Sequence, residues 1–85
     1  MNKEVINSLQ FLAKQYGIIC RVFEKKNMII LTLGYTDAPE NFLQFDEEDL
    51  PEIAIEVVRI TGIKPVLKTV KDYKYTLKRL YVDFN

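Results

Sequence analysis

The 85-residue chain has no histidine, one cysteine and one serine, and these scarcities exclude much of the commonest enzyme chemistry. Histidine is the most frequent general base and the most frequent transition-metal ligand. Cys20 has no second cysteine to pair with, so the chain forms neither an internal disulfide nor a thiolate metal cluster. Ser8 has no histidine with which to form a triad, and we expect it to be a solvated helix residue. We therefore expect no catalytic residue, no metal site and no cofactor, and the sequence indicates a protein that is not an enzyme.

Long apolar runs are also missing. The longest one, Met28–Leu31, is far too short to span a bilayer. Lys3 is followed at once by Glu4, which is not the layout of a signal peptide. The composition, with 48% hydrophobic and 28% charged residues, is typical of a globular protein. We expect one small domain over residues 1–85, a cytoplasmic location and no membrane partner.

Basic residues are absent between Lys26 and Arg59, although the net charge of the chain is zero. Acidic residues fill this gap: Asp37, Glu40, Asp46, Glu47, Glu48, Asp49, Glu52 and Glu56. From Arg59 onward, basic residues outnumber acidic ones. A neutral chain with one acidic and one basic region indicates charged partners or self-association.

The first half of the chain predicts a helix followed by a β-hairpin. Residues 2–16 have the apolar spacing of one helical face, with Asn2 as a cap and Gly17 as a terminator. Residues 18–35 form two apolar, β-branched segments separated by a polar break. A two-residue turn at Lys26-Asn27 would place Cys20 opposite Leu33 and direct its thiol into the core. We expect Cys20 to be a small hydrophobic residue, not a nucleophile.

The second half predicts one helix and one strand, and two further segments each fit two structures. Residues 41–45 fit either a short strand or a loop held by two aromatic residues. A helix should begin near Asp46 or Asp49, with Pro51 in its first turn, and end at Gly62. Residues 63–70 predict a strand at a sheet edge, because Pro65 cannot donate to a ladder. The last segment fits a helix through Val70, Tyr73, Leu77, Leu80, Tyr81 and Phe84; a strand with a bulge near Lys78 and Arg79 is the alternative.

Together these elements predict an α+β fold. A small antiparallel sheet, made of the hairpin 18–35 and a strand near 65–70, packs against two or three helices. The favoured function is a small protein-interaction module, such as an adaptor, inhibitor or regulator. It would present the eight acids between Asp37 and Glu56 to a partner protein, and homo-oligomerisation is a variant of this hypothesis.

The alternative function is nucleic-acid binding by the basic C-terminal third. Lysines and arginines neutralise phosphates, and an aromatic face stacks on bases. The candidate residues are Lys68, Lys71, Lys74, Tyr75, Lys78 and Arg79. No recognised nucleic-acid-binding motif is present, and the isoelectric point of about 6.2 is low for such a domain.

Overall fold

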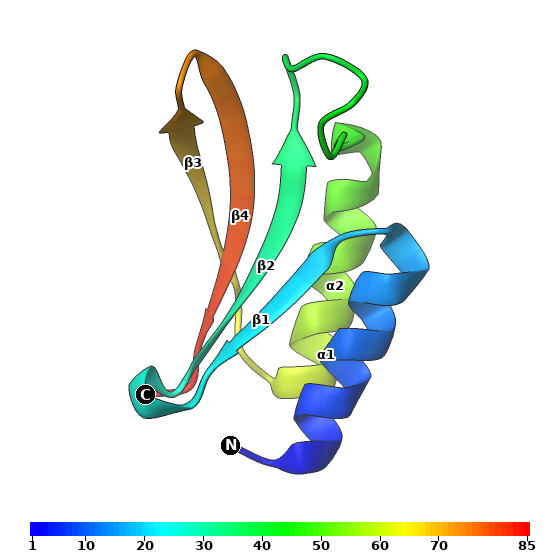
Figure 1. The fold of residues 1–85 in the computed structure, drawn as a ribbon. Coiled ribbons are helices and arrows are strands. Elements are labelled where there is room, and N and C mark those ends of the chain that lie inside the picture. Colours follow the sequence, from blue (N-terminus) through cyan, green and yellow to red (C-terminus); the bar gives the residue numbers. More distant parts are fainter.

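A four-stranded antiparallel sheet carries both helices on one of its faces and leaves the other face open (Figure 1). The computed structural model describes residues 1–85, with the element order α1-β1-β2-α2-β3-β4 and the strand order β1-β2-β4-β3. Both termini lie at the same end of the molecule, and the β3–β4 turn and the loop after β2 lie at the other (Figure 1). The predicted α+β class is therefore confirmed.

Helix α1 covers Lys3–Tyr16 and begins and ends where the sequence predicts. The Asn2 side chain accepts a hydrogen bond from the Glu4 N–H at 2.7 Å, which satisfies one of the free donors of the first turn. Gly17 ends the helix in the left-handed conformation, with a φ of 65°. The buried face of α1 contains Leu9, Leu12 and Ala13. Phe11 points away from it and is 65% exposed.

Strands β1 (Ile19–Phe23) and β2 (Met28–Tyr35) form the predicted hairpin, but in a different register. Cys20 lies opposite Leu31 rather than Leu33. The turn is longer than two residues, because Glu24–Lys26 form a 3₁₀ turn that Asn27 closes with a φ of 51°. A shift of two residues leaves every side chain on its predicted face, since side chains alternate along a strand. Cys20 is half-buried on the helix-covered face, as expected of its orientation.

The loop after β2 returns across the end of the sheet. The backbone of residues 41–45 contributes a single bridge, between Tyr35 and Gln44, and is otherwise a loop. Gly34 permits this course, because a Cβ atom there would lie 2.8 Å from the Leu43 carbonyl oxygen. A 3₁₀ turn, Glu47–Asp49, leads into α2, which covers Leu50–Thr61 and ends at Gly62. Asp46 caps the 3₁₀ turn, whereas Asp49, at the N-cap position of α2, makes no side-chain cap bond.

The last segment is a pair of strands, β3 (Val66–Asp72) and β4 (Tyr75–Asp83), so the favoured helix is wrong. Leu77 and Leu80 have helical spacing, but they lie on opposite faces of β4. Leu80 joins the core beneath the helices, whereas Leu77, opposite Tyr35, is 5% exposed on the open face. The bulge that the strand alternative predicts near Lys78 and Arg79 is absent from β4, and the one register irregularity lies in β2, between Thr32 and Gly34. Strand β3 is at a sheet edge, as Pro65 predicts.

The core lies between the sheet and the two helices. It combines residues of α1, β2, α2 and β4 with Ile18, just before β1: Leu9, Leu12, Ala13, Ile18, Ile29, Leu31, Leu33, Ile53, Val57, Leu80 and Val82. No residue of β3 belongs to it, and β3 is exposed along most of its length. The helix layer therefore stops short of this edge of the sheet.

Candidate functional site

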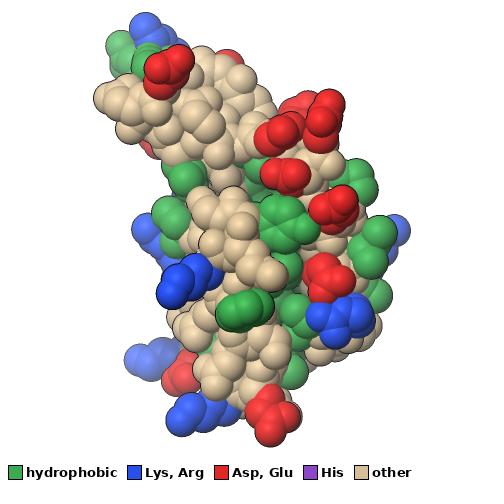
Figure 2. Space-filling model, turned by 90° about the vertical axis from the view of Figure 1, so that its right-hand side faces the viewer, with side chains coloured by type: hydrophobic (Ala, Val, Ile, Leu, Met, Phe, Trp, Pro, Cys, Tyr) green, Lys and Arg blue, Asp and Glu red, His purple; other side chains and the backbone are tan.

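The predicted acidic residues form a row along the outer side of α2 and the loop that precedes it. Figure 2 views the helix-covered side of the molecule and shows acidic side chains running down one side of it to a basic residue. Glu40, Glu47 and Glu48 are exposed and make no side-chain hydrogen bond or ion pair. The row ends at Arg59, which is paired with Glu56 at 2.5 Å. Hydrogen bonding from Arg59 lowers the pKa of the Glu56 carboxyl.

Three of the predicted acids have structural roles within the chain. Asp37 accepts hydrogen bonds from Thr76, which holds the loop against β4 and lowers the pKa of its carboxyl. Asp46 caps the 3₁₀ turn through the Glu48 N–H at 3.0 Å. Glu52 accepts a hydrogen bond from the Tyr16 hydroxyl at 3.0 Å, which ties α2 to α1 and raises the tyrosine pKa.

An apolar groove of about 490 Å³ lies between α2 and β3, next to the acidic row. Its lining is almost entirely apolar: Leu50, Ala54, Ile55, Val58, Lys64, Pro65, Leu67 and Leu80. Ile55 is 65% exposed, and Val58 and Leu67 are each 42% exposed. The groove exists because β3 extends the sheet beyond the helix layer. Sequence analysis missed it, since the exposed apolar residues of α2 and β3 are adjacent only in the folded chain.

A larger hollow, of about 630 Å³, lies between α1 and α2. Its lining includes Asn7, Ser8 and Gln15, and the charges of Glu56 and Arg59 within it neutralise each other. Ser8 is exposed on α1. The rest of the lining, Phe11, Leu12, Tyr16 and Ile60, mixes apolar with polar surface, and the hollow has no net charge.

The residues of the nucleic-acid alternative do not form one surface. Lys68 and Arg79 lie on the open face of the sheet, directly opposite each other across β3 and β4. Lys71 and Lys78 lie on the other face, where they donate to Thr76 and Thr69.

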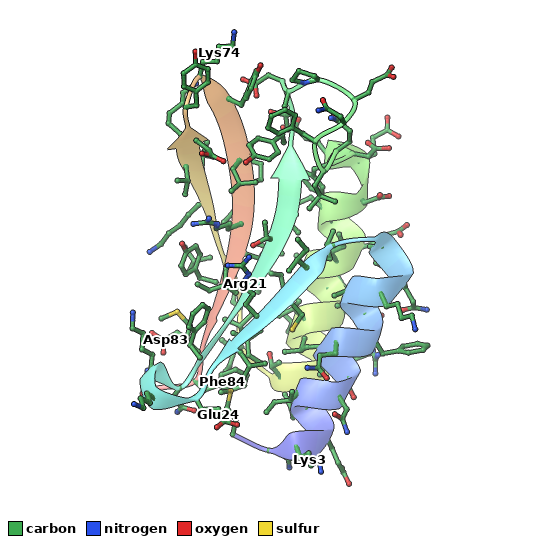
Figure 3. All side chains as sticks on the ribbon, viewed as in Figure 1. Lys3, Arg21, Glu24, Lys74, Asp83 and Phe84 are labelled. Atoms are coloured by element: carbon green, nitrogen blue, oxygen red, sulfur yellow. The ribbon has the colours of Figure 1, made fainter.

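Lys74 and Tyr75 are at the β3–β4 hairpin end, where Figure 3 labels Lys74. Tyr75 is half-buried, and its ring packs edge-on against those of Tyr35 and Phe42.

Cys20 has no neighbour that would activate it. Burial raises the pKa of its thiol, which disfavours the reactive thiolate. Nowhere do three His, Cys, Asp or Glu side chains come together in an arrangement suited to a metal ion. Neither helix is long and apolar enough to cross a membrane.

Comparison of the chain with protein-family models, curated protein sequences and solved structures gives no match. The class that the fold defines is a small α+β domain with one open sheet face. The two surfaces with a distinct chemical character are the acidic row and the apolar groove.

Proposed function

We propose that the protein is a small, non-catalytic interaction module that binds a basic, partly apolar segment of a partner protein. The observation that carries this proposal is that α2 contributes to both surfaces: Ile55 and Val58 line the apolar groove, and Glu52 and Glu56 belong to the acidic row. Leu50 lines the groove, and the exposed, unpaired Glu47 and Glu48 lie in the 3₁₀ turn directly before it. One occupant could therefore use both surfaces at once.

The two surfaces would make different contributions to binding. Removing Ile55, Val58 and Leu67 from water supplies affinity, because the free energy scales with the apolar area buried. Glu47 and Glu48 would attract cationic side chains, which accelerates association and disfavours acidic competitors. A segment with aliphatic residues flanked by lysine or arginine fits this combination best.

The proposal is tested by selecting peptides from a random displayed library on the immobilised protein. We expect the enriched peptides to combine aliphatic with basic residues, and their binding to weaken with added salt. Enrichment of acidic peptides, or no enrichment at all, would contradict the proposal.

Substitutions then locate the site on the protein. Ile55→Asp should reduce the affinity for a selected peptide by at least about tenfold, as expected for a central apolar contact. Phe11→Asp is the matched control, because Phe11 is equally exposed, at 65%, but lies on α1 outside the groove. The triple change of Glu47, Glu48 and Glu52 to Lys should slow association at low salt. Equal binding by all of these variants would place the peptide elsewhere.

A further inference from the structure

The open face of the sheet carries three basic side chains that form no ion pair: Arg21, Lys68 and Arg79. Figure 3 shows Arg21 on the side of the sheet away from the helices. The register places Arg79 and Lys68 on this same face, on β4 and β3. The one salt bridge of the protein joins Arg59 to Glu56, on the opposite side. All side-chain hydrogen bonds from basic residues come from Arg59, Lys71 and Lys78, so these three cations donate none.

Lys68 and Arg79 are directly opposite each other on adjacent strands. Like charges at this position destabilise a sheet unless an anion lies between or above them. Arg79 is half-buried, and its guanidinium makes no hydrogen bond or ion pair within the chain. The arrangement is unfavourable for the isolated protein and favourable for a protein that holds an anion at this position.

Arg21 and Arg79 also line the same shallow pocket, of about 270 Å³, on this face. Thr32 and Tyr35 are in the lining too, and Asp72 is its one carboxylate. The Tyr35 hydroxyl donates a hydrogen bond to one oxygen of Asp72, which raises the pKa of the tyrosine, and Asp72 forms no ion pair with either guanidinium. Asp83, at the far end of the face, is held by Asn85. The two guanidiniums outnumber the one carboxylate of the pocket, which therefore keeps a net positive charge.

Two aromatic side chains flank the cations on the same face. Tyr81 is half-buried, with the Lys68 ammonium 4.4 Å from its ring centroid, and Phe23 on β1 is 37% exposed. An open sheet face that mixes cations with aromatic rings suits single-stranded nucleic acid, whose phosphates meet the cations and whose bases stack on the rings. A base-paired duplex keeps its bases stacked internally and cannot use the rings.

We infer that the open sheet face binds single-stranded nucleic acid, with Arg21, Lys68 and Arg79 contacting phosphates and Tyr81 stacking on a base. This inference is independent of the proposed α2–β3 docking surface, which lies on the other side of the sheet. It also differs from the sequence-based alternative, since Arg21 and Tyr81 replace Lys71, Lys74, Tyr75 and Lys78.

The test is fluorescence anisotropy of a labelled oligothymidylate titrated with the whole protein at several salt concentrations. For three phosphate contacts, the logarithm of the association constant should fall with the logarithm of salt with a slope of about −2. A duplex of the same length should bind more weakly than the single strand. Salt-insensitive binding, no binding at low salt, or tighter binding of the duplex would overturn the inference.

Variants assign the binding to this face. The double variant Arg21→Gln/Arg79→Gln should bind at least about tenfold more weakly at low salt and reduce the slope to about −0.7. The control Lys3→Gln/Lys14→Gln removes the same charge from α1 and should retain the slope of the unmodified protein. Equal losses in the two double variants would mean that only net charge matters, which would overturn the site.

Two further variants separate the roles of charge and ring from effects on folding. Arg79→Lys keeps the charge at the half-buried position and should keep the salt slope. Tyr81→Leu keeps an apolar side chain in the sheet but removes the stacking surface, and should weaken binding at least about fivefold without changing the slope. Thermal melts of all variants establish that they are folded. Undiminished binding by folded Tyr81→Leu would overturn the stacking assignment.

Discussion

Asp37 holds the long loop to the sheet by accepting two hydrogen bonds from Thr76. The Thr76 backbone N–H donates to one carboxylate oxygen at 2.7 Å, and the Thr76 hydroxyl donates to the other at 2.9 Å. The sequence assigned Asp37 to a partner-binding surface, but in the structure its carboxylate is engaged inside the chain. The loop between β2 and α2 therefore has a defined position at the end of β4.

This pairing predicts a specific pH dependence of stability. The folded-state pKa of Asp37 is below its ordinary value, chiefly because of the Thr76 backbone N–H. The resulting stabilisation is fully present above the unfolded pKa, about 3.9, and is lost as the pH falls through the folded value. Asp37→Ala should lower the melting temperature at neutral pH, and the difference from the unmodified protein should shrink below about pH 4. Glu40→Ala is the control. A difference that persists unchanged in strong acid would contradict the assignment.

Leu77 provides a test of the small packed region on the open face of the sheet. It is 5% exposed although no helix covers it. The neighbouring side chains Tyr35 and Leu43, which line the same shallow pocket, cover it instead. Leu77→Ala should lower the free energy of unfolding by about 2–5 kcal/mol, measured by urea denaturation. Phe11→Ala, at a position that is 65% exposed, should change it by less than about 0.5 kcal/mol. Similar costs at both positions would mean that Leu77 is not packed.

Tyr73 occupies a strained backbone position in the β3–β4 turn. Its φ is 59°, a region that glycine adopts freely and a bulky residue adopts at a cost of about 1–2 kcal/mol. The side chain is 85% exposed, so its loss removes little packing. Tyr73→Gly should leave stability unchanged or raise it by up to about 1 kcal/mol, because relief of strain offsets the greater entropy of the unfolded chain.

Lys74→Gly is the matched control for this turn, since the backbone of Lys74 does not adopt a positive φ. It should be destabilising by about 0.5–1 kcal/mol relative to the unmodified protein. The comparison is made by thermal melting of both variants. A lower melting temperature for Tyr73→Gly than for Lys74→Gly would show that the turn is not strained at Tyr73.

Cys20 should react slowly with thiol reagents in the folded protein. Its side chain is half-buried against the core, and burial raises the thiol pKa, so little thiolate is present at neutral pH. The rate of labelling should increase strongly in denaturant, and Cys20→Ser should cost about 1 kcal/mol, the low end for a half-buried polar substitution. Labelling of the native protein as fast as the unfolded chain would contradict the orientation of β1.

The helix predicted for the last segment was wrong because β4 buries apolar side chains on both of its faces. Leu77 and Leu80 are three residues apart and mimic one side of a helix. In the folded chain, Leu77 lies on the open face, where residues around Tyr35 cover it. Leu80 lies on the opposite face, where the helices cover it. Nothing local in the sequence shows that β4 has apolar cover on both faces. The ends of α1 were predictable, because Asn2 and Gly17 act within one turn of the helix.

The candidate surfaces were predictable to a smaller extent. The acidic row followed from the absence of basic residues before Arg59 and from the predicted helix that carries Glu52 and Glu56. The groove beside it did not, because Leu67 meets Ile55 only through the packing of β3 alongside α2. The pairing of Lys68 with Arg79 required the register of two strands, one of which the sequence favoured as a helix.

The two free edges of the sheet differ in their protection against aggregation (Figure 1). Strand β3 presents charges along its length, which discourages the addition of a further strand. Strand β1 reads ICRVF, and Arg21 is its one charge. A gatekeeping charge within such an apolar edge limits the growth of intermolecular sheets. An Arg21→Gln variant is therefore the one expected to form β-rich aggregates first when the protein is concentrated or warmed.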